Sequence, residues 1–320
     1  MNDTVTWGLL GAVLVLLIIA TVVVQLLRRS RPEVINSEIV ESFSGRLRAW
    51  WLLFAGLAGA IVLGKTATVV FFGLISFWAL REFITLTPTR PSDHRALFWV
   101  FVLCTPAQYV LVGYAQYDLF AIIIPVYALL FLHTRIAFSN DPVRFLERTA
   151  KIQMGLLICV YCLSYAPALL TTLELGNDAY NLRLLFFLVF ITQLSDALQF
   201  AWSQLPSRHV VVPNINPTRT WEGLLGGSAS VTLIGAMLWW ALPFNSIWIT
   251  AGLSLVISLV AFAGGITMSA IKRDRGVKDY GTLVAGHTGV LDRIDSLCFA
   301  APVFFHLTQI YLALQPAASA

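Results

Sequence analysis

The sequence predicts an all-α integral membrane protein that crosses the bilayer many times. Of its 320 residues, 58% are hydrophobic and 12% are charged, whereas soluble domains carry about 25% charged residues. Apolar runs of about 15 to 21 residues follow one another along the chain, close to the roughly 20 residues that a membrane helix needs. These runs lack the strict alternation of apolar and polar residues that is typical of strands, so a barrel is not expected.

About ten membrane-spanning helices are predicted from these runs. The second and third helices are separated at Gly64-Lys65, because merging them would break the charge asymmetry described next. The predicted spans are residues 7–27, 49–64, 66–83, 96–114, 119–134, 153–172, 184–203, 224–243, 247–268 and 296–313.

The basic residues predict the orientation of these helices. With ten crossings, only Lys65 and Arg183 of the 21 Lys and Arg residues fall on the side of the termini, and the other 19 fall on the opposite side. Cytoplasmic loops carry an excess of Lys and Arg. Both termini are therefore predicted to lie outside, with the basic loops in the cytoplasm.

Two regions are predicted along the chain. Residues 1–48 form an N-terminal transmembrane anchor with a basic linker, and residues 49–320 form the main membrane-embedded domain. The first apolar run is preceded by Asp3 and followed by Arg28 and Arg29, the reverse of a secretory signal, so it is predicted to be retained. The four cysteines all lie in apolar runs, which predicts no disulfide framework. A net charge of +4 gives no indication of nucleic-acid binding.

The most polar stretch of the chain, residues 269–296, follows the ninth predicted helix. Basic side chains interspersed with glycines suit phosphate binding, because the cations neutralise phosphate oxygens and the backbone can approach closely. Carboxylates in the same loop make sense when a divalent cation lies between protein and phosphates. Asp279, Asp292 and Asp295 are the candidates for that role. An ordinary salt-bridged cytoplasmic loop is the alternative.

A second polar group lies in the seventh predicted helix. Thr192, Asp196, Gln199 and Ser203 are spaced so that they share one helical face. An aspartate within the hydrocarbon region is costly and marks a candidate functional site, although a hydrogen-bonded structural aspartate at a helix interface is the alternative. Asp196 lies near the predicted cytoplasmic end, where the polar loop also begins, so the two are expected to meet.

The third group is the segment NINPTRTWEGLLGG, residues 214–227. Pro213 and Pro217 prevent the preceding helix from continuing. Arg219, Thr220 and Glu222 then precede the eighth predicted helix, and Thr220 is predicted to cap it. The positive end of that helix would then face an anion. An ordinary loop followed by a helix start is the alternative.

Together, these three segments resemble the phosphatidate cytidylyltransferase (CDP-diacylglycerol synthase) family. The resemblance is clearest over residues 190–305, and its most specific part runs without a gap from Ser269 to Asp295. The matching residues are Ser269, Ile271, Lys272-Arg273, Lys278-Asp279, Gly286-His287-Thr288-Gly289 and Leu291-Asp292-Arg293-Ile294-Asp295, together with Asp196 and the segment NPTRTWEGLLGG.

This resemblance implies that a lipid phosphate, phosphatidate, attacks the α-phosphorus of CTP and yields CDP-diacylglycerol and pyrophosphate. Mg²⁺ is the implied cofactor, with a monovalent cation as an additional candidate. The implied catalytic residues are Asp292, Asp279, Lys272, Lys278 and His287. The implied substrate-binding residues are Arg219, Thr220, Glu222, Arg273 and Arg293, and the implied metal ligands are Asp292, Asp196 and Asp295.

The sequence departs from the family pattern at several positions of the candidate site. Gly265 stands where the family usually has an aspartate, Arg219 replaces a lysine, Asn216 replaces a serine and Thr288 replaces a glycine. Since magnesium affinity depends on the number of ligands, the sequence predicts that Gly265→Asp raises activity at low magnesium.

Two other functions stay open from the sequence. A catalytically weakened paralogue that binds nucleotide or anionic lipid is favoured by Gly265. A lipid transporter is favoured by the ten predicted helices and by Asp196, but the contiguous signature disfavours it. The expected location is a bacterial cytoplasmic membrane with the active site facing the cytoplasm, and a homodimer is left open.

Overall fold

The computed structural model describes residues 3–30, 37–87, 89–173, 175–205, 209–277 and 289–315. Within them the regular structure is helical apart from one two-stranded sheet, which confirms the all-α prediction. The chain divides into two compact units, residues 1–71 and 72–320. The boundary that the sequence suggested after residue 48 lies within the helix Ser37–Leu63, and that division stays a prediction.

The first unit contains α1 (Thr4–Ser30), α2 (Ser37–Leu63) and the start of α3 (Lys65–Leu86). Leu17 and Val24 of α1 pack against Leu47 of α2. Gly64 separates α2 from α3 with a φ of 106°, a backbone conformation that glycine adopts without strain. The predicted break at Gly64-Lys65 is therefore confirmed.

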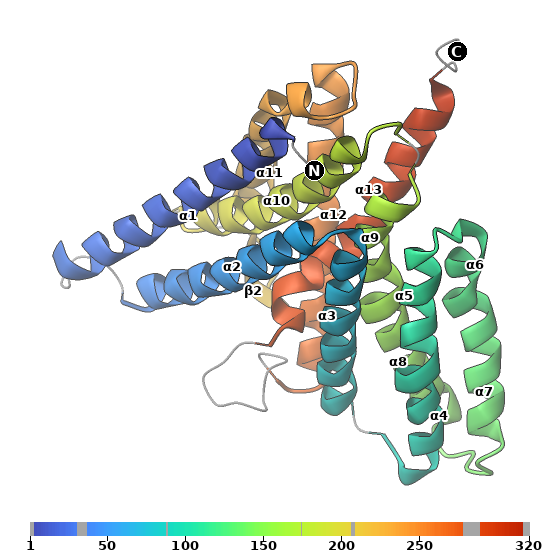
Figure 1. Cartoon of the computed structure of the whole chain (residues 1–320). Coiled ribbons are helices and arrows are strands. Elements are labelled where there is room, and N and C mark those ends of the chain that lie inside the picture. Colours follow the sequence, from blue (N-terminus) through green and yellow to red (C-terminus); the bar gives the residue numbers. More distant parts are fainter. Residues whose placement is uncertain are drawn as a thin grey trace. The chain divides into compact units, whose positions relative to one another are not determined.

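The second unit begins within α3 and contains the remaining elements, coloured from blue-green to red in Figure 1. Short 3₁₀ and π segments, labelled η, interrupt or extend several helices. The elements are η1 (Pro91–Asp93), α4 (His94–Trp99), η2 (Val100–Cys104), α5 (Thr105–Gly113), α6 (Tyr117–Ile122), η3 (Ile123–Ala128), α7 (Leu129–Ala137), α8 (Phe145–Leu156), η4 (Leu157–Cys162), α9 (Leu163–Thr171), α10 (Asp178–Trp202), β1 (Val210–Val212), β2 (Asn216–Thr220), α11 (Trp221–Met237), η5 (Trp239–Ala241), α12 (Ile247–Asp274) and α13 (Leu291–Leu314).

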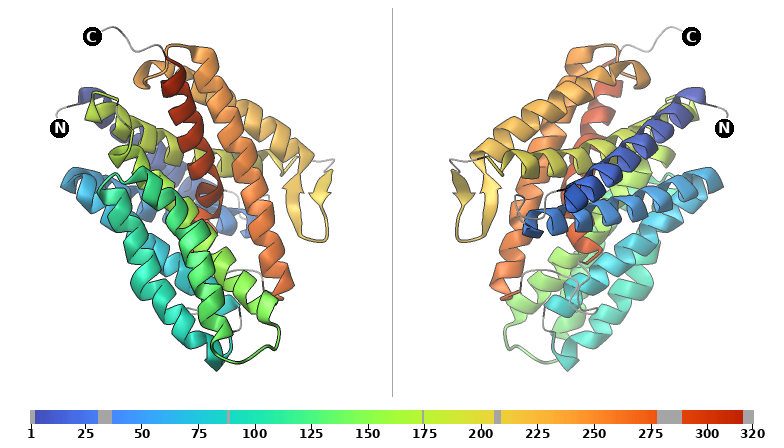
Figure 2. Two further views of the ribbon diagram at one scale, coloured as in Figure 1. Left: turned by 90° about the vertical axis from the view of Figure 1, so that its right-hand side faces the viewer. Right: turned by 90° about the vertical axis from the view of Figure 1, so that its left-hand side faces the viewer.

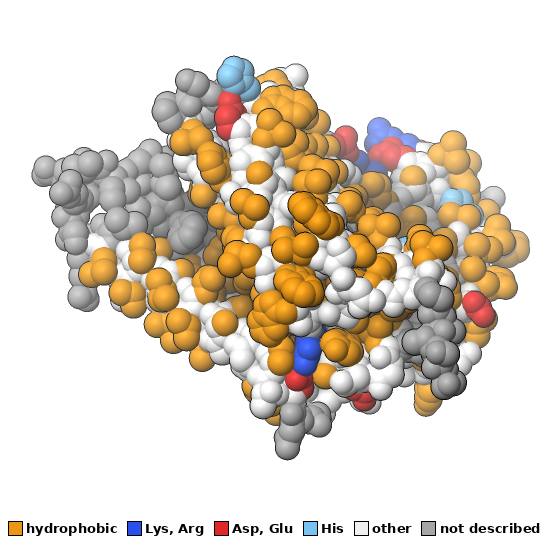
Figure 3. Space-filling model, turned by 90° about the horizontal axis from the view of Figure 1, so that it is seen from above, with side chains coloured by type: hydrophobic (Ala, Val, Ile, Leu, Met, Phe, Trp, Pro, Cys, Tyr) orange, Lys and Arg blue, Asp and Glu red, His pale blue; other side chains and the backbone are white. Residues whose placement is uncertain are grey.

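Eight stretches of the described residues are long and apolar enough to cross a membrane. Large hydrophobic side chains are exposed along these stretches, and hydrophobic atoms cover much of the face drawn in Figure 3. The protein is therefore a polytopic membrane protein. Two of the ten predicted spans correspond to shorter helices, the stretch Trp50–Leu63 and α11. The count of ten and the outside termini stay predictions.

Helix α13 is central to the second unit, since it packs against α9, α10 and α12. Its inward side chains Phe304 and Phe305 are fully buried, as is Tyr165 of α9. The rings of Tyr165 and Phe305 meet edge to face, with 5.2 Å between their centroids. This packing fixes the position of the polar residues at the other end of α13.

Strands β1 and β2 form an antiparallel hairpin that pairs Val210 with Thr220 and Val212 with Asn216. The hairpin projects from the helices that it connects, α10 and α11 (Figure 2). The sequence predicted a proline-broken loop at this place. The strands were missed because each is short and β2 contains Pro217, a residue that central strands exclude.

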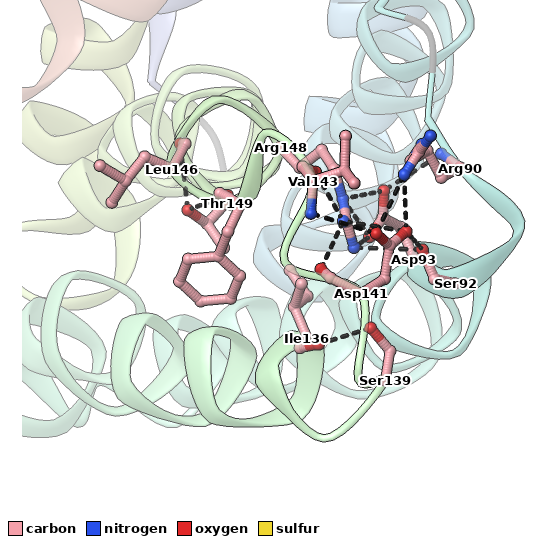
Figure 4. A network of polar contacts seen from close by, with 11 residues as sticks. Arg90, Ser92, Asp93, Ile136, Ser139, Asp141, Val143, Leu146, Arg148 and Thr149 are labelled. Carbon is pink, nitrogen blue, oxygen red and sulfur yellow. Dashed lines mark hydrogen bonds and ion pairs between the residues drawn. The ribbon is translucent and has the colours of Figure 1, made fainter.

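A buried ion pair joins α8 to the segment before α4 (Figure 4). The Arg148 guanidinium donates to both carboxylate oxygens of Asp93, and the two side chains are 4% and 0% exposed. Arg148 also donates to the backbone oxygens of Asp141 and Val143. Desolvation would raise the pKa of the Asp141 carboxyl group, but hydrogen bonds from Val143 and Ser92 and the charge of Arg90 outweigh it and lower that pKa. This network closes one end of the bundle that α4, α5, α7 and α8 form.

Candidate active site

The end of α12 and the start of α13 bring the first pair of predicted site residues together. Lys272 Nζ lies 2.8 Å from Asp292 Oδ1, and these side chains are 14% and 8% exposed. Both residues are near the ends of their helices, and the segment that joins them in the sequence contains residues 278–288. The predicted site residues Lys278, Asp279 and His287 therefore lie outside the described residues.

A second ion pair joins the hairpin to α10. Arg219, at the end of β2, reaches across so that its Nη2 lies 3.3 Å from Asp196 Oδ1. Its Nη1 donates to Gln199 Oε1 at 2.8 Å, and its guanidinium carbon lies 5.4 Å from the ring centre of Phe262. A planar guanidinium held on two edges and one face has little rotational freedom. Arg219 is therefore held as a fixed positive charge beside Asp196.

The structure places Arg219 directly against Gly265 of α12. A β-carbon added at residue 265 would lie 2.5 Å from Arg219 Nη2 and 3.2 Å from its Cζ. The space beside Gly265 is thus occupied by the guanidinium. Two departures from the family pattern, at positions 219 and 265, are in contact, which the sequence did not reveal.

Gln199 supports Arg219 from within the helix packing. Its amide nitrogen donates to Ser195 Oγ at 2.9 Å and to the backbone oxygen of Ser258 at 3.2 Å, which orients its oxygen toward Arg219. Ser258 belongs to α12, so this network joins α10 and α12 beneath the ion pair. The sequence placed Gln199 on the face of Asp196 but assigned it no role.

Helix α11 begins directly after Thr220, the residue that was predicted to cap it. Its hydroxyl accepts a hydrogen bond from the Gly223 amide at 3.0 Å and caps the helix, which confirms the capping prediction. Glu222 accepts from His209 Nδ1 at 2.5 Å and from the His209 amide at 3.1 Å. The hydrogen bond from His209 lowers the pKa of Glu222 to about 2. Glu222 therefore closes the base of the hairpin.

The hairpin is also tied to α12. Asn216 Nδ2 donates to Ser269 Oγ at 3.0 Å, and Arg273 Nε donates to the backbone oxygen of Ile215 at 3.1 Å. Ser269 in turn donates to the backbone oxygen of Gly265 at 2.7 Å. Asparagine at position 216, another departure from the family pattern, thus fixes the hairpin to the helix that carries Lys272.

The remaining predicted residues lie on the first turns of α13. The Asp295 carboxylate interacts electrostatically with Asp196, Lys272 and Arg219, so the three described carboxylates and the two cations form one charged cluster. We call these five residues the charged cluster: Asp196, Arg219, Lys272, Asp292 and Asp295. Arg293 lies beside it, and its backbone oxygen accepts from Gln193 Nε2 at 3.1 Å.

The charged cluster contains carboxylates, which are ligands that Mg²⁺ prefers. Among the described residues, no group of three or more His, Cys, Asp or Glu side chains is close enough to hold a metal ion. Mg²⁺, however, commonly uses one or two carboxylates together with phosphate oxygens. The donor chemistry of Asp196, Asp292 and Asp295 therefore fits a divalent cation that is shared with a bound triphosphate.

The fold and this cluster define a polytopic helical membrane protein whose candidate site combines three carboxylates with two basic side chains. A family model described as the cytidylyltransferase family matches residues 44–311. The chain therefore belongs to the cytidylyltransferase family, whose reaction is CTP-dependent transfer of a cytidylyl group.

Three relatives show how far this similarity extends. The uncharacterized protein YnbB of Escherichia coli (strain K12) is 38% identical over 302 residues, which cover 93% of this chain and 96% of that protein. The phosphatidate cytidylyltransferase of Staphylococcus aureus (strain COL) is 32% identical over 124 residues, and that of Staphylococcus haemolyticus (strain JCSC1435) is 30% identical over 124 residues. Each of these two matches covers 38% of this chain and 48% of the enzyme.

Proposed function

We propose that this protein transfers the cytidylyl group of CTP to phosphatidate, forming CDP-diacylglycerol and pyrophosphate in phospholipid synthesis. Membership of the cytidylyltransferase family supports the reaction type. The choice of phosphatidate is supported by the names of the two staphylococcal relatives and by the apolar helices that carry four of the five residues of the charged cluster. A lipid phosphate reaches such a site by diffusion within the bilayer, while CTP arrives from water.

The charged cluster is the observation that carries this proposal. Asp196 and Arg219 form one ion pair and Lys272 and Asp292 form another, and both are largely removed from water. Phosphate groups that bind here would replace the aspartates as the partners of Arg219 and Lys272, because charge-assisted hydrogen bonds to phosphate are strong. The carboxylates of Asp196 and Asp292 would then be released to face a cation. The two ion pairs thus hold the site in place before the substrates arrive.

The proposed reaction is a single displacement at the α-phosphorus of CTP. A phosphate oxygen of the lipid forms a bond to that phosphorus, and the bond from that phosphorus to the oxygen that links it to the β-phosphorus breaks. Pyrophosphate leaves with that electron pair, so no covalent intermediate with the protein is needed. The work of the protein is then to position the substrates and to neutralise charge. Lys272 and Arg219 would stabilise the negative charge on the phosphates.

The proposed cation site uses the carboxylates of the charged cluster. At most two of the carboxylates of Asp292, Asp295 and Asp196 at a time would hold Mg²⁺, which when bound neutralises charge on the phosphate oxygens. Asp279 and a monovalent cation are further candidates for this site. Arg273 and Arg293 would contact phosphates near the hairpin and the start of α13. We also propose that the site faces the cytoplasm of a bacterial cytoplasmic membrane, and a homodimer stays an alternative to a monomer.

The alternative function is a weakened relative that binds nucleotide without turning it over. The contact between Arg219 and Gly265 favours it, because a cation fills the space where a further carboxylate would stand. Both functions predict CTP binding. Only the enzymatic function predicts transfer of the cytidylyl group to lipid.

The decisive experiment uses the purified full chain in vesicles that contain phosphatidate. With CTP labelled at the α-phosphate, the label is expected in chloroform-extractable lipid and to depend on both phosphatidate and Mg²⁺. With CTP labelled at the γ-phosphate, the label is expected in pyrophosphate and not in lipid. Lipid labelling from the γ-position would indicate phosphoryl transfer and contradict the proposal. CTP binding without lipid labelling from either position would establish the alternative.

A further inference from the structure

Glu82 of α3 is a buried carboxylate that contacts the start of α13. Its side chain is 5% exposed, and it lies outside the segments that contain the predicted site residues. Oε1 accepts a hydrogen bond from the Val290 amide at 3.0 Å, and Oε2 accepts one from the Leu291 amide at 2.8 Å. Trp78 Nε1, one turn earlier on α3, donates to Oε1 at 3.0 Å. The carboxylate is thus held between two elements far apart in the sequence.

This contact supplies a cap that α13 lacks in its own sequence. The first amides of a helix have no partner within the helix, and a side-chain oxygen at the preceding position commonly accepts from one of them. Val290 precedes α13 and has no side-chain oxygen, and α13 has no side-chain cap of that kind. Glu82 accepts from amides at this terminus instead. Its negative charge is also favourable at the positive end of the helix.

Two consequences follow for the charged cluster. Asp292 comes directly after Leu291, so the contact that fixes the Leu291 amide also fixes the backbone from which the Asp292 carboxylate projects. The start of α13 is, in addition, already neutralised by a carboxylate. It therefore offers no extra attraction for phosphate, and that task is left to side chains such as Lys272 and Arg219.

We propose that Glu82 is a positioning residue for Asp292, acting through the start of α13 without touching the substrates. The proposal rests on the proposed cytidylyl transfer for its catalytic readout. It also extends the site to the first hundred residues, which lie outside the clear resemblance. A small displacement of a catalytic group can slow a reaction on the order of a hundredfold. Loss of the Glu82 contact is therefore expected to act on turnover more than on substrate binding.

Glu82→Gln is the main test variant. Glutamine keeps the length and one acceptor oxygen, but it turns an NH₂ group toward one of the two amides and removes the charge. The expected result is a fall in kcat of roughly tenfold to a hundredfold, with the KM for CTP changed by less than about threefold. Glu82→Asp keeps the charge but is one methylene too short to accept from both amides, and the same pattern is expected. This second variant covers the case in which Glu82→Gln does not fold.

Asp93→Asn is the matched control, because Asp93 is a buried carboxylate on the same unit and pairs with Arg148 of α8. This control is expected to lower thermal stability while leaving kcat per folded molecule unchanged. A second readout, hydrogen exchange of a peptide covering residues 289–295, does not depend on activity. Exchange there is expected to rise in Glu82→Gln and to stay unchanged in Asp93→Asn.

These readouts separate the two proposals. If wild-type protein makes no CDP-lipid, the transfer proposal fails, and the exchange measurement still tests the contact of Glu82 with α13. Unchanged exchange in Glu82→Gln would overturn the inference. Faster exchange with a wild-type kcat would also overturn it, since the contact would then be structural alone. If kcat falls equally in Glu82→Gln and in Asp93→Asn, the inference is also overturned.

Discussion

At the scale of single residues, the site is organised by pairs of opposite charge whose members come from different segments. Arg219 comes from the hairpin and Asp196 from α10, while Lys272 and Asp292 come from α12 and α13. Each pair lowers the energetic demand of holding a charge away from water, because an isolated buried charge is strongly disfavoured. The same pairing keeps each group available for a ligand of opposite charge.

Gly265→Asp is a variant for which the structure leads to a different expectation from the one that the sequence suggested. The sequence predicted a gain of activity at low magnesium, but a β-carbon at residue 265 overlaps Arg219. The new carboxylate would pair with Arg219 and withdraw it from phosphate. Since a hydrogen bond to a charged group is worth about 1.5–3 kcal/mol, the rate should fall roughly tenfold to a hundredfold. A magnesium titration of lipid labelling measures this change.

Two matched variants separate the causes. Gly265→Ala displaces the guanidinium slightly without adding charge and should have a smaller effect. Gly265→Asp combined with Arg219→Lys removes the overlap and should regain activity relative to Gly265→Asp alone. A higher activity of the single Gly265→Asp variant at low magnesium would restore the original expectation and contradict the role given to Arg219.

Asp292→Asn is expected to lower the rate of lipid labelling by about a hundredfold to a thousandfold, the effect of losing one key electrostatic interaction. The amide keeps an acceptor for Lys272 Nζ, so the fold should be retained. Asp274→Asn is the control, because Asp274 lies at the end of α12 and pairs with Arg275. A near-wild-type rate for Asp292→Asn at limiting magnesium would remove Asp292 from the proposed cation site.

At the scale of elements, polar contacts hold the β1–β2 hairpin against the neighbouring helices. It is held at its base by Glu222 and His209 and along its length by Asn216 and Arg273. Because Arg219 projects from this hairpin, any movement of the hairpin carries the guanidinium away from Asp196. Polar contacts at the surface thus control the geometry of the charged cluster.

The hairpin is therefore expected to loosen in acid. The hydrogen bond from His209 lowers the pKa of Glu222 from 4.5 to about 2. A carboxyl group whose pKa is lowered in the folded state stabilises that state above the unfolded pKa, and the contribution is lost as the pH falls through the folded pKa. Hydrogen exchange of the His209 amide, corrected for its intrinsic pH dependence, should rise between about pH 4.5 and pH 2.

Glu222→Gln provides the comparison for this prediction. The variant should show faster exchange of the His209 amide already at neutral pH and no further loosening over the same acid range. Equal exchange in the wild type and the variant at neutral pH would show that Glu222 does not hold the hairpin.

At the scale of the whole molecule, the orientation in the membrane can be tested by labelling. Arg144 precedes α8 and Arg275 follows α12, and Glu147, one turn after Arg144, interacts electrostatically with Arg275. The two ends are therefore neighbours, as expected if both are cytoplasmic. Lys65 and Arg183 are predicted to lie on the other side.

Cysteine substitutions at these four positions should give two labelling patterns with a membrane-impermeant thiol reagent. Positions 65 and 183 should react from outside, and positions 144 and 275 should react only after the cytoplasmic face is opened. The background protein, with its four native cysteines, must first be shown to be silent. Labelling of positions 65 and 275 from the same side would rule out the model with ten spans.

Local features of the sequence determined the membrane character, the helix break at Gly64 and the cap at Thr220. Each depends on hydropathy or backbone preference within a few residues, and each agrees with the structure. The motifs also identified all five residues of the charged cluster, because the order of charged residues along the chain is itself the signature. The structure then showed that Asp196, Arg219, Lys272, Asp292 and Asp295 lie together.

Only the tertiary structure decided which of these groups touch one another. The contact of Arg219 with Gly265 and that of Glu82 with Leu291 join residues that are far apart in the sequence. Such contacts depend on how the helices pack and on the axial position of each residue relative to the neighbouring helix. Local sequence preferences determine neither of these. The one hint in the sequence was an acidic residue near the end of an apolar helix, at Glu82. Its partner could be found only once α3 and α13 were packed side by side.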